Sequence, residues 1–453
     1  MCKEFIVIGI PDSNEPVRDA QTARMISENR LFSGGKRHHE LLLPYLPDGH
    51  TWIDITVPLD AVFEKYAQTV GTIVVFASGD PLFFGFANTI RRKLPDAKIS
   101  LYPSFNSLQM LAHRLVMPYH DMHIVSLTGR PWHEFDAALI RRIPKIGILT
   151  DGTHTPSAIA RRMLEYGYDD YVMSVGVRLG NPELESVSTL TLQEAAESDF
   201  DMPNCVIAEA RSKKQEARGE KQEARSKKQE ISNEEKQEAR SKRQEARGEK
   251  QEVRGERFDE ERVHPIPEQL FELLDGREKM ITKAPIRQLT LAALELYKRT
   301  SFWDIGFCTG SVSIEAKLQY PHLLVTAFEI REEGRQLMET NSHRFHAPGI
   351  ATVIGDFMLL DVESYPQPDA VFIGGHGGQL PEMIRKAEKC LKAGGVLVYN
   401  CVSPEAVSDS RIRTDSRQRF VETAEACGMK VELPLHVAIN DYHPIDILKA
   451  RKI

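Results

Sequence analysis

The stretch WDIGFCTG at residues 303–310 constrains the fold more than any other part of the chain. It places Gly306 and Gly310 between an apolar run, typical of a buried strand, and residues 311–318, which favour a helix. Glycine adopts backbone torsions that other residues resist, and the free N–H groups at the start of a helix attract electron-rich ligand atoms. The pattern therefore predicts a strand, a glycine turn and a helix, with a ligand site at the turn.

Two acidic residues are predicted to follow the next two strands. Residues 324–328 are predicted to form a strand that ends at Glu329, about one βαβ unit after the glycine turn, where a carboxylate can accept hydrogen bonds from both hydroxyls of a ribose. Residues 351–354 are predicted to form a strand before Asp356, whose carboxylate stands beside an aromatic residue and suits an adenine. These strand ends together resemble the nucleoside site of class I S-adenosylmethionine methyltransferases.

The glycine turn has two other interpretations. A single two-glycine turn is also compatible with a tight βα turn that binds nothing. A nicotinamide site needs a Gly-x-Gly-x-x-Gly run, which residues 306–310 do not supply. The three strand ends in order favour the methyl donor.

Length, charge and cysteine spacing limit the classes of protein to which the chain can belong. A chain of 453 residues predicts two or three domains. The net charge of −7 disfavours binding to a nucleic-acid backbone. The six cysteines form no Cys-x-x-Cys pair and no Cys/His cluster at zinc spacing, so we expect no metal site and a reducing, cytoplasmic location. Since no apolar run approaches the ~20 residues of a membrane helix, we expect neither export nor a membrane anchor.

Residues 1–208 alternate apolar runs with helical patterns and predict an α/β domain with a largely buried sheet. The predicted strands are 5–10, 72–76, 98–102, 123–127, 145–149 and 171–177. The most unusual turn is SGDPLFFG at residues 78–85, where a buried strand stops at a glycine and a proline fixes the exit. Open α/β sheets bind ligands at such strand ends.

Several motifs of this region together resemble the tetrapyrrole methylases of the cobalamin pathway, most closely the branch that methylates carbon 5 of precorrins. They are FSGGKRH (32–38), SGDPLFFG (78–85), SLTGRP (126–131), LTDG (149–152) followed by Thr155 and Pro156, and RLG (178–180). The resemblance implies a class III methyltransferase fold of two α/β lobes with the methyl donor between them. It implies donor contacts from Gly9, Ser78, Gly79, Asp80, Phe83 and Ser107.

The chain departs from that family at two loops. After the first strand it has GIPD at residues 9–12, where the family usually has a Gly-x-Gly-Pro turn. At residues 105–107 it has FNS, where relatives commonly carry adjacent serines. Only Ser107 matches there.

Residues 209–262 change in composition. Units of the type KQEAR repeat every seven to eight residues between 214 and 254, and apolar side chains nearly vanish. One small apolar residue a unit is too little for a coiled-coil seam, while the abundant Glu, Lys and Arg suit a solvated helix or a disordered tether. We expect a charged repeat linker, with a partner-binding element as the alternative.

Residues 263–453 are predicted to form the last domain, with a helix at 288–297 before the glycine turn. The segments MITKAPIR (280–287), PDAVFIGG (368–375) and LKAGGVLVYN (391–400) resemble the decarboxylating carbon 15 methyltransferase of the same pathway. The match weakens beyond residue 403, because VAINDYHP (437–444) stands where relatives often have a glycine-rich segment. The fold class is therefore α/β throughout, with a Rossmann-like class I domain after the class III domain.

The last domain offers one set of donor-binding candidates and one set of catalytic candidates. The resemblance to the carbon 15 methyltransferase implies Thr282, Lys283 and Arg287, the strand-end pattern supplies the other donor-binding residues, and His376 between two glycine pairs could assist a proton transfer. The donor-binding set is Thr282, Asp304, Gly306, Gly310, Glu329 and Asp356. The catalytic candidates are Lys283, Arg287 and His376. The alternatives are a helix N-terminus with solvent-facing charges for the first two and an exposed loop histidine for the third.

Together the resemblances imply a fusion of two enzymes that use S-adenosyl-L-methionine to methylate carbons 5 and 15 of a precorrin and remove the carbon 12 acetate as carbon dioxide. Cationic side chains should line the slot for the polyacidic tetrapyrrole, with Lys36, Arg37 and Arg130 as candidates in the first half. We expect a homo-oligomer that binds neither nucleic acid nor membrane. An RNA or protein methyltransferase and a non-catalytic donor-binding scaffold remain alternatives.

Overall fold

The computed structural model describes residues 3–11, 16–17, 19–211, 264–277, 280–402, 415–439 and 443–453. The predicted repeat linker lies almost entirely outside the described residues, as does Asp12 of the first turn. Contacts within the chain divide it into two compact units. The first comprises Met1–Pro131, Ile143–Leu164 and Asp169–Ala210, and the second comprises Trp132–Arg142, Glu165–Tyr168 and Arg211–Ile453. Among the described helices, none is long and apolar enough to cross a bilayer.

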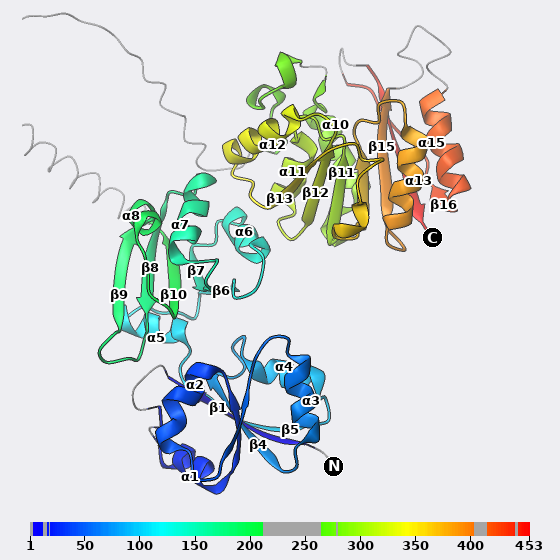
Figure 1. The fold of residues 1–453 in the computed structure, drawn as a ribbon. Coiled ribbons are helices and arrows are strands. Elements are labelled where there is room, and N and C mark those ends of the chain that lie inside the picture. The colour runs from blue at the N-terminus through cyan, green and yellow to red at the C-terminus, as the bar shows by residue number, and fades with distance from the viewer. Residues whose placement is uncertain are drawn as a thin grey trace, which may run out of the picture. The chain divides into compact units, whose positions relative to one another are not determined.

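Strands and helices largely alternate along residues 3–211 (Figure 1). The six predicted strands are present, and four further strands were not predicted, at Leu31–Gly34, Thr51–Asp54, Ser186–Thr191 and Asn204–Ala210. The strands are β1 (Glu4–Ile10), β2 (Leu31–Gly34), β3 (Thr51–Asp54), β4 (Thr72–Ser78), β5 (Lys98–Tyr102), β6 (His123–Ser126), β7 (Lys145–Leu149), β8 (Tyr171–Val177), β9 (Ser186–Thr191) and β10 (Asn204–Ala210). The helices are α1 (Ala20–Glu28), α2 (Lys36–Leu42), α3 (Asp60–Gln68), α4 (Phe86–Lys93), α5 (Ser107–Arg114), α6 (His133–Ile140), α7 (Pro156–Glu165) and α8 (Leu192–Glu197).

The first unit contains two separate five-stranded sheets. The first has the order β3-β2-β4-β1-β5 and is parallel throughout. The second has the order β6-β7-β10-β8-β9 and is antiparallel except between β6 and β7. Strand β4 lies inside the first sheet with Ile73 to Ala77 all buried, as its continuous apolar run requires. These two α/β layers confirm the predicted two-lobed fold.

The second unit is built on one large sheet (Figure 1). Its strands are β11 (Ser301–Ile305), β12 (Leu324–Glu329), β13 (Ile350–Ile354), β14 (Ala370–Ile373), β15 (Val396–Val402), β16 (Met429–Val431), β17 (Leu435–Val437) and β18 (Ile445–Lys452). Its helices are α10 (Ala284–Leu294), α11 (Ser311–Gln319), α12 (Glu333–Arg344), α13 (Leu380–Cys390) and α15 (Asp415–Ala426).

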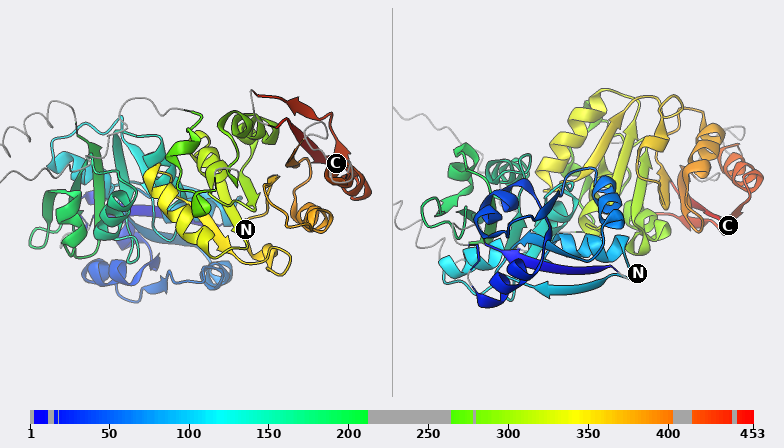
Figure 2. Two further views of the ribbon diagram at one scale, coloured as in Figure 1. Left: turned by 90° about the horizontal axis from the view of Figure 1, so that it is seen from above. Right: turned by 60° about the horizontal axis from the view of Figure 1, so that its bottom comes forward.

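This sheet has the order β13-β12-β11-β14-β15-β18-β16, with β17 also paired to β18. The five strands from β13 to β15 are parallel, so their carboxyl ends share one edge, and β18 is antiparallel to β15. Helices cover both faces, as the views in Figure 2 show. Leu291 of α10 and Val312 of α11 pack on one face, and Ile384 of α13 and Phe420 of α15 pack on the other. This is the predicted Rossmann-like arrangement.

One predicted helix has different bounds. The sequence pattern predicted a helix at 288–297, whereas α10 begins at Ala284 and ends at Leu294. Pro285 suits the first helical turn because its fixed φ is already helical and the missing N–H would have no partner there. The helix ends because Glu295 takes a left-handed conformation with φ 55°. Because the helix starts earlier than predicted, Arg287 lies within α10 and not before it.

Candidate functional site

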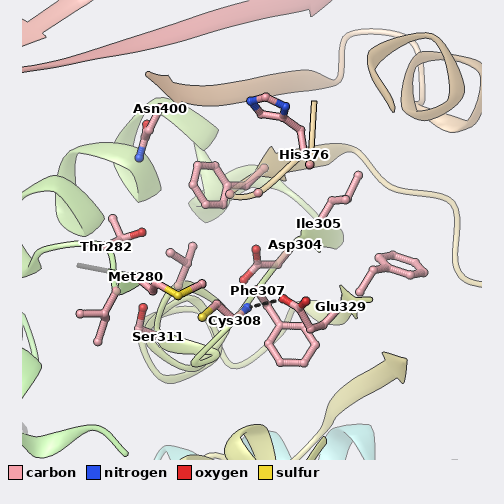
Figure 3. Close-up of a pocket in the computed structure, with 18 of the residues that line it drawn as sticks. Met280, Thr282, Asp304, Ile305, Phe307, Cys308, Ser311, Glu329, His376 and Asn400 are labelled. Atoms are coloured by element: carbon pink, nitrogen blue, oxygen red, sulfur yellow. Dashed lines mark hydrogen bonds between the residues drawn. The ribbon is translucent and has the colours of Figure 1, made fainter. Parts of the chain in front are cut away.

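A cavity of about 890 Å³ opens at the shared carboxyl edge of the second unit's sheet (Figure 3). Its lining comes from the turns after β11, β12, β13 and β14, from the carboxyl half of β15, from the segment before α10, and from Val437, Ile439, His443 and Ile445 in and between β17 and β18. Parallel strands leave their last carbonyl and N–H groups free at this edge, and the loops that follow diverge to opposite faces. The cavity therefore lies where the sequence predicted a ligand.

The glycine turn between β11 and α11 has no room for a side chain at either of its two glycines. Gly306 has φ +76°, and a Cβ built on it would lie 2.5 Å from the carbonyl oxygen of Gly375. Gly310 has φ +75°, and a Cβ there would lie 2.6 Å from the sulfur of Met338. Gly306 lines the cavity, whereas Gly310 precedes α11 and shapes the turn.

Glu329 joins the end of β12 to the glycine turn. It is 3% exposed, and its Oε2 accepts a 2.9 Å hydrogen bond from the backbone N–H of Cys308. Its Oε1 accepts from the backbone N–H groups of Ile330 and Arg331, at 3.0 and 3.1 Å. These donors fix the carboxylate at the cavity wall, where it still has lone pairs for a ligand hydroxyl.

Asp304 is a buried acid at the end of β11. Its Oδ2 accepts a 2.6 Å hydrogen bond from the hydroxyl of Ser313, while its Oδ1 is buried and has no partner among the described residues. Burial raises the pKa of Asp304 to about 7, against the opposing effect of the bond from Ser313. Near neutral pH the carboxyl is partly protonated, so Oδ1 can either accept a hydrogen bond from a ligand or an ordered water or donate one to it.

Asp356 follows β13 and also lines the cavity. Its Oδ1 accepts a 2.9 Å hydrogen bond from the backbone N–H of Met358, which orients the carboxylate. Phe357 beside it is 3% exposed and belongs to the apolar wall. The acid and the ring therefore stand together, as the strand-end pattern predicted.

The segment before α10 brings Thr282 and Lys283 to the opposite wall of the cavity. Lys283 is the N-cap residue of α10. The carbonyl of Thr282 accepts a 2.6 Å hydrogen bond from a guanidinium nitrogen of Arg287, so the position of this segment depends on that side chain.

Arg287 itself does not line the cavity. Its side chain is fully buried, and its Nε donates a 2.6 Å hydrogen bond to Glu315, which is also fully buried. Burial raises the pKa of Glu315, but the hydrogen bond from His264 and the charge of Arg287 outweigh burial and hold it below its ordinary value. The structure thus gives Arg287 a contact inside the fold and not the place facing the substrate that its motif suggested.

His376 lines the cavity with both ring nitrogens engaged. Nδ1 accepts a 3.0 Å hydrogen bond from the backbone N–H of Gly378, so the proton of the neutral ring is on Nε2, which lies 3.2 Å from the hydroxyl of Tyr399. Burial and the charge of Arg419 lower the pKa of His376. The ring is therefore neutral near neutral pH and, in this arrangement, has no free lone pair to act as a base.

Other lining residues had no role in the sequence analysis. Ser311 at the start of α11, Cys308 in the glycine turn, and Asn400 at the end of β15 all face the cavity. A lone serine, cysteine or asparagine at a strand or helix end carries no specific signal, although the glycine-turn motif already contained Cys308.

In the first unit, Gly9, Gly79 and Ser107 come together. A Cβ on Gly9 would lie 1.7 Å from the carbonyl oxygen of Gly79, and a Cβ on Gly79 would lie 2.8 Å from the Cα of Asn106. The two glycines therefore let β1, the loop after β4 and the start of α5 pack backbone against backbone. Ser107 is the first residue of α5, and its hydroxyl is hydrogen-bonded to the buried thiol of Cys205.

The remaining candidates of the first unit surround the same loop. Ser78 interacts through its hydroxyl with Arg37 at 3.2 Å and with His38 at 2.9 Å. Asp80 accepts a 2.8 Å hydrogen bond from the backbone N–H of Leu82, which tightens the turn, and Phe83 packs against the apolar cluster around α5.

Two further cationic candidates differ in their contacts. The guanidinium of Arg130 lies 4.9 Å from the centroid of the Phe84 ring, beside the loop that carries Asp80. Lys36 is 91% exposed and lies 4.0 Å from Glu40. Among the described residues, no group of three or more His, Cys, Asp or Glu could hold a metal ion.

Two protein families match this chain. The family described as tetrapyrrole (corrin/porphyrin) methylases matches residues 7–196, and the precorrin methyltransferase domain family matches residues 274–418. The two matches fall on either side of the repeat.

Individual relatives agree with these matches. A Sinorhizobium protein named precorrin-6Y C(5,15)-methyltransferase [decarboxylating] is 28% identical over 88% of this chain and 84% of its own length. A Salmonella typhimurium protein named cobalt-precorrin-6B C(15)-methyltransferase (decarboxylating) is 38% identical over 30% of this chain and 69% of its own length. A solved structure from Geobacter metallireducens, named precorrin-6y C5,15-methyltransferase, is 31% identical, covers 42% of this chain and 98% of its own, and has a TM-score of 0.37.

The first relative spans both halves of the chain, and the second reaches only the half with the cavity. The chain therefore belongs to the family of decarboxylating precorrin-6Y C5,15-methyltransferases.

Proposed function

We propose that this protein methylates a precorrin-6Y or a cobalt-precorrin-6B at carbons 5 and 15 and removes the carbon 12 acetate as carbon dioxide, within corrin ring synthesis. The observation that carries this proposal is the cavity at the carboxyl edge of the second unit, where Gly306, Glu329 and Asp356 follow three neighbouring strands. The names of the Sinorhizobium and Salmonella relatives supply the substrate.

We assign carbon 5 methylation to residues 1–208, carbon 15 methylation with decarboxylation to residues 263–453, and tethering to residues 209–262. The two family matches, which lie on either side of the repeat, support this division. We also propose a cytoplasmic homo-oligomer that binds neither nucleic acid nor membrane. The net charge of −7 supports the absence of nucleic-acid binding.

The residues present in the second unit fit S-adenosyl-L-methionine. Glu329 offers fixed acceptors for ribose hydroxyls, Asp356 offers an acceptor beside an aromatic ring, and the unpartnered Oδ1 of Asp304 suits an N–H or O–H of the ligand or a bridging water. Gly306 leaves the backbone open to close approach. When bound, this donor supplies a methyl group on a positively charged sulfur.

The chain's own residues would act mainly by holding the two reactants in line. Lys283 at the cavity wall suits a substrate carboxylate, since an ammonium group binds carboxylates and an acidic tetrapyrrole carries several. His376, with both nitrogens engaged, would hold the loop after β14 against Tyr399 and not move a proton.

The test is an anaerobic incubation of the full chain with S-adenosyl-L-methionine and either metal-free or cobalt-bearing precorrin-6 substrate, followed by mass spectrometry. The proposal expects two added methyl groups and one lost carbon dioxide. Unchanged substrate in both incubations, with a correctly folded chain, would refute it.

A further inference from the structure

Asn400 occupies a distinct place in the cavity of the second unit. In the parallel register, Ile305 pairs with Ile373, and Ile373 pairs with Tyr399, so the next level across the three strands consists of Gly306, Gly374 and Asn400. Two of these three have no side chain. The amide of Asn400 is therefore the side chain that β11, β14 and β15 offer to a ligand at this level.

The orientation of that amide is fixed by α10. The hydroxyl of Thr290 donates its single hydrogen to the carbonyl of Ile286, at 2.7 Å. Toward Asn400 the same hydroxyl is only an acceptor, so the atom 2.8 Å away is the amide nitrogen Nδ2. It follows that the amide oxygen Oδ1 points away from Thr290.

This oxygen is buried and has no hydrogen-bond partner among the described residues, although Asn400 lines the cavity. Leaving a buried acceptor unpaired is unfavourable, and such atoms in native proteins are usually satisfied by a ligand or water. The group that satisfies it must carry an N–H or O–H. An ionised carboxylate has neither an N–H nor an O–H, so it would place one hydrogen-bond acceptor against another.

The position of Asn400 favours the substrate over the methyl donor. Glu329 and Asp356 stand at the ends of β12 and β13, whereas β15 lies on the other side of β11 and β14. At about 4.8 Å between neighbouring strands, β12 and β15 are ~14 Å apart. Figure 3 shows Asn400 and His376 at the end of the cavity opposite to Glu329 and Cys308.

We propose that Oδ1 of Asn400 accepts a hydrogen bond from a ring N–H of the tetrapyrrole, and that the carbon 15 site therefore takes a metal-free substrate. This inference rests on the proposed function. A partly reduced tetrapyrrole is puckered, so a ring N–H tilts out of its face toward such an acceptor. In a cobalt-bearing ring the nitrogens bind the metal and offer no N–H at that position.

The contact would also serve the chemistry. As a bridge carbon attacks, its π electrons form the new carbon–carbon bond, the carbon–sulfur bond breaks with its electrons on sulfur, and the conjugated ring nitrogen gains positive charge. An amide oxygen fixed against that N–H interacts more strongly as the charge grows. Asn400 would thus stabilise the transition state more than the bound substrate.

The experiment compares the wild-type chain with Asn400→Leu, which removes the acceptor at similar volume, and Thr290→Val, which keeps Asn400 but removes the hydroxyl that orients it. Carbon 15 methylation of metal-free substrate should fall about 10- to 100-fold in kcat/KM for Asn400→Leu and less for Thr290→Val, the range for a hydrogen bond to a charged group. Binding of S-adenosylhomocysteine, followed by hydrogen exchange in residues 303–310, should be unchanged in both variants.

Three results would overturn the inference. The first is equal turnover by Asn400→Leu and wild type. The second is weakened binding of S-adenosylhomocysteine by Asn400→Leu, which would assign the amide to the methyl donor. The third is a preference of the wild type for the cobalt-bearing substrate. If the wild type methylates neither substrate, the proposed function fails. Direct binding of metal-free tetrapyrrole to wild type and Asn400→Leu, in the presence of S-adenosylhomocysteine, then still tests the contact.

Discussion

The carboxylate of Glu329 accepts a 2.9 Å hydrogen bond from the backbone N–H of Cys308, and this bond connects the end of β12 to the glycine turn that follows β11. The two residues are neighbours only in the folded sheet. The bond gives Glu329 a fixed orientation in the cavity before any ligand arrives, so little freedom is lost when a ligand hydroxyl binds.

Replacement of Glu329 by Gln should weaken donor binding in the second unit. The change keeps the size of the side chain but places an amide where several N–H groups require acceptors, and a hydrogen bond to a charged group contributes about 1.5–3 kcal/mol. We expect a loss of about 10- to 100-fold in affinity for S-adenosylhomocysteine, measured by hydrogen exchange in residues 303–310. Glu332→Gln is the control, because the side chain of Glu332 is 75% exposed and its ion pair is with Arg335 of α12. Equal affinities in both variants would contradict the assignment of Glu329.

Asp304 should make the stability of the second unit depend on pH. Burial raises its pKa to about 7 in the folded chain, above the ordinary value of about 4. Between these two values the folded state holds a proton that the unfolded state has lost, so the free energy of unfolding should fall as pH rises from 4 to 7. Each unit of pKa difference corresponds to about 1.4 kcal/mol.

Asp304→Asn removes the titrating group while keeping the shape of the side chain. The pH dependence of exchange protection in β11, corrected for the intrinsic exchange rate, should then be flatter than in the wild type. An identical slope in wild type and variant would show that Asp304 does not carry this dependence.

Arg287 and Glu315 should behave as a buried pair. Arg287→Met leaves the carboxylate of Glu315 buried without its cation, which should cost about 3–5 kcal/mol of unfolding free energy. Arg287→Met with Glu315→Leu should recover only part of the loss, because Arg287 also donates hydrogen bonds to the carbonyls of Thr282 and Ile266. Urea unfolding of the full chain measures both. If Arg287→Met unfolds like the wild type but raises KM for the tetrapyrrole, Arg287 is a substrate ligand and the assignment to a buried pair is wrong.

These residues also show which parts of the candidate site could be predicted from the sequence alone. Glu329 and Asp356 could be placed near Gly306 because the carboxyl ends of neighbouring parallel strands meet at one edge, and apolar runs followed by acids mark such ends. The structure confirms those strands, while the role of each acid in donor binding stays a prediction. Arg287 could not be placed, since the start of α10 at Ala284 and a partner 28 residues away, Glu315, decide which way it points.

The sequence could not predict the roles of side chains that depend on contacts with residues distant in the chain. The unpartnered oxygen of Asn400 follows from a hydroxyl on α10, 110 residues earlier, and the engaged nitrogens of His376 follow from a loop N–H and from Tyr399. No local motif encodes such contacts. In the first unit the backbone packing of Gly9 on Gly79 could not be predicted either, although both glycines lie in the loops compared with the family.

The masses of the products made by two variants test the division of labour between the two halves most directly. A Val side chain at Gly306 would collide with the backbone of Gly375, and Asp80→Ala removes the acceptor that tightens the loop after β4. With the full chain and excess donor, Gly306→Val should yield a product with one new methyl and all its carboxyl groups. Asp80→Ala should yield a product with one new methyl that has lost one carbon dioxide. Release of carbon dioxide by Gly306→Val at the wild-type rate, or addition of both methyls by Asp80→Ala, would contradict the account.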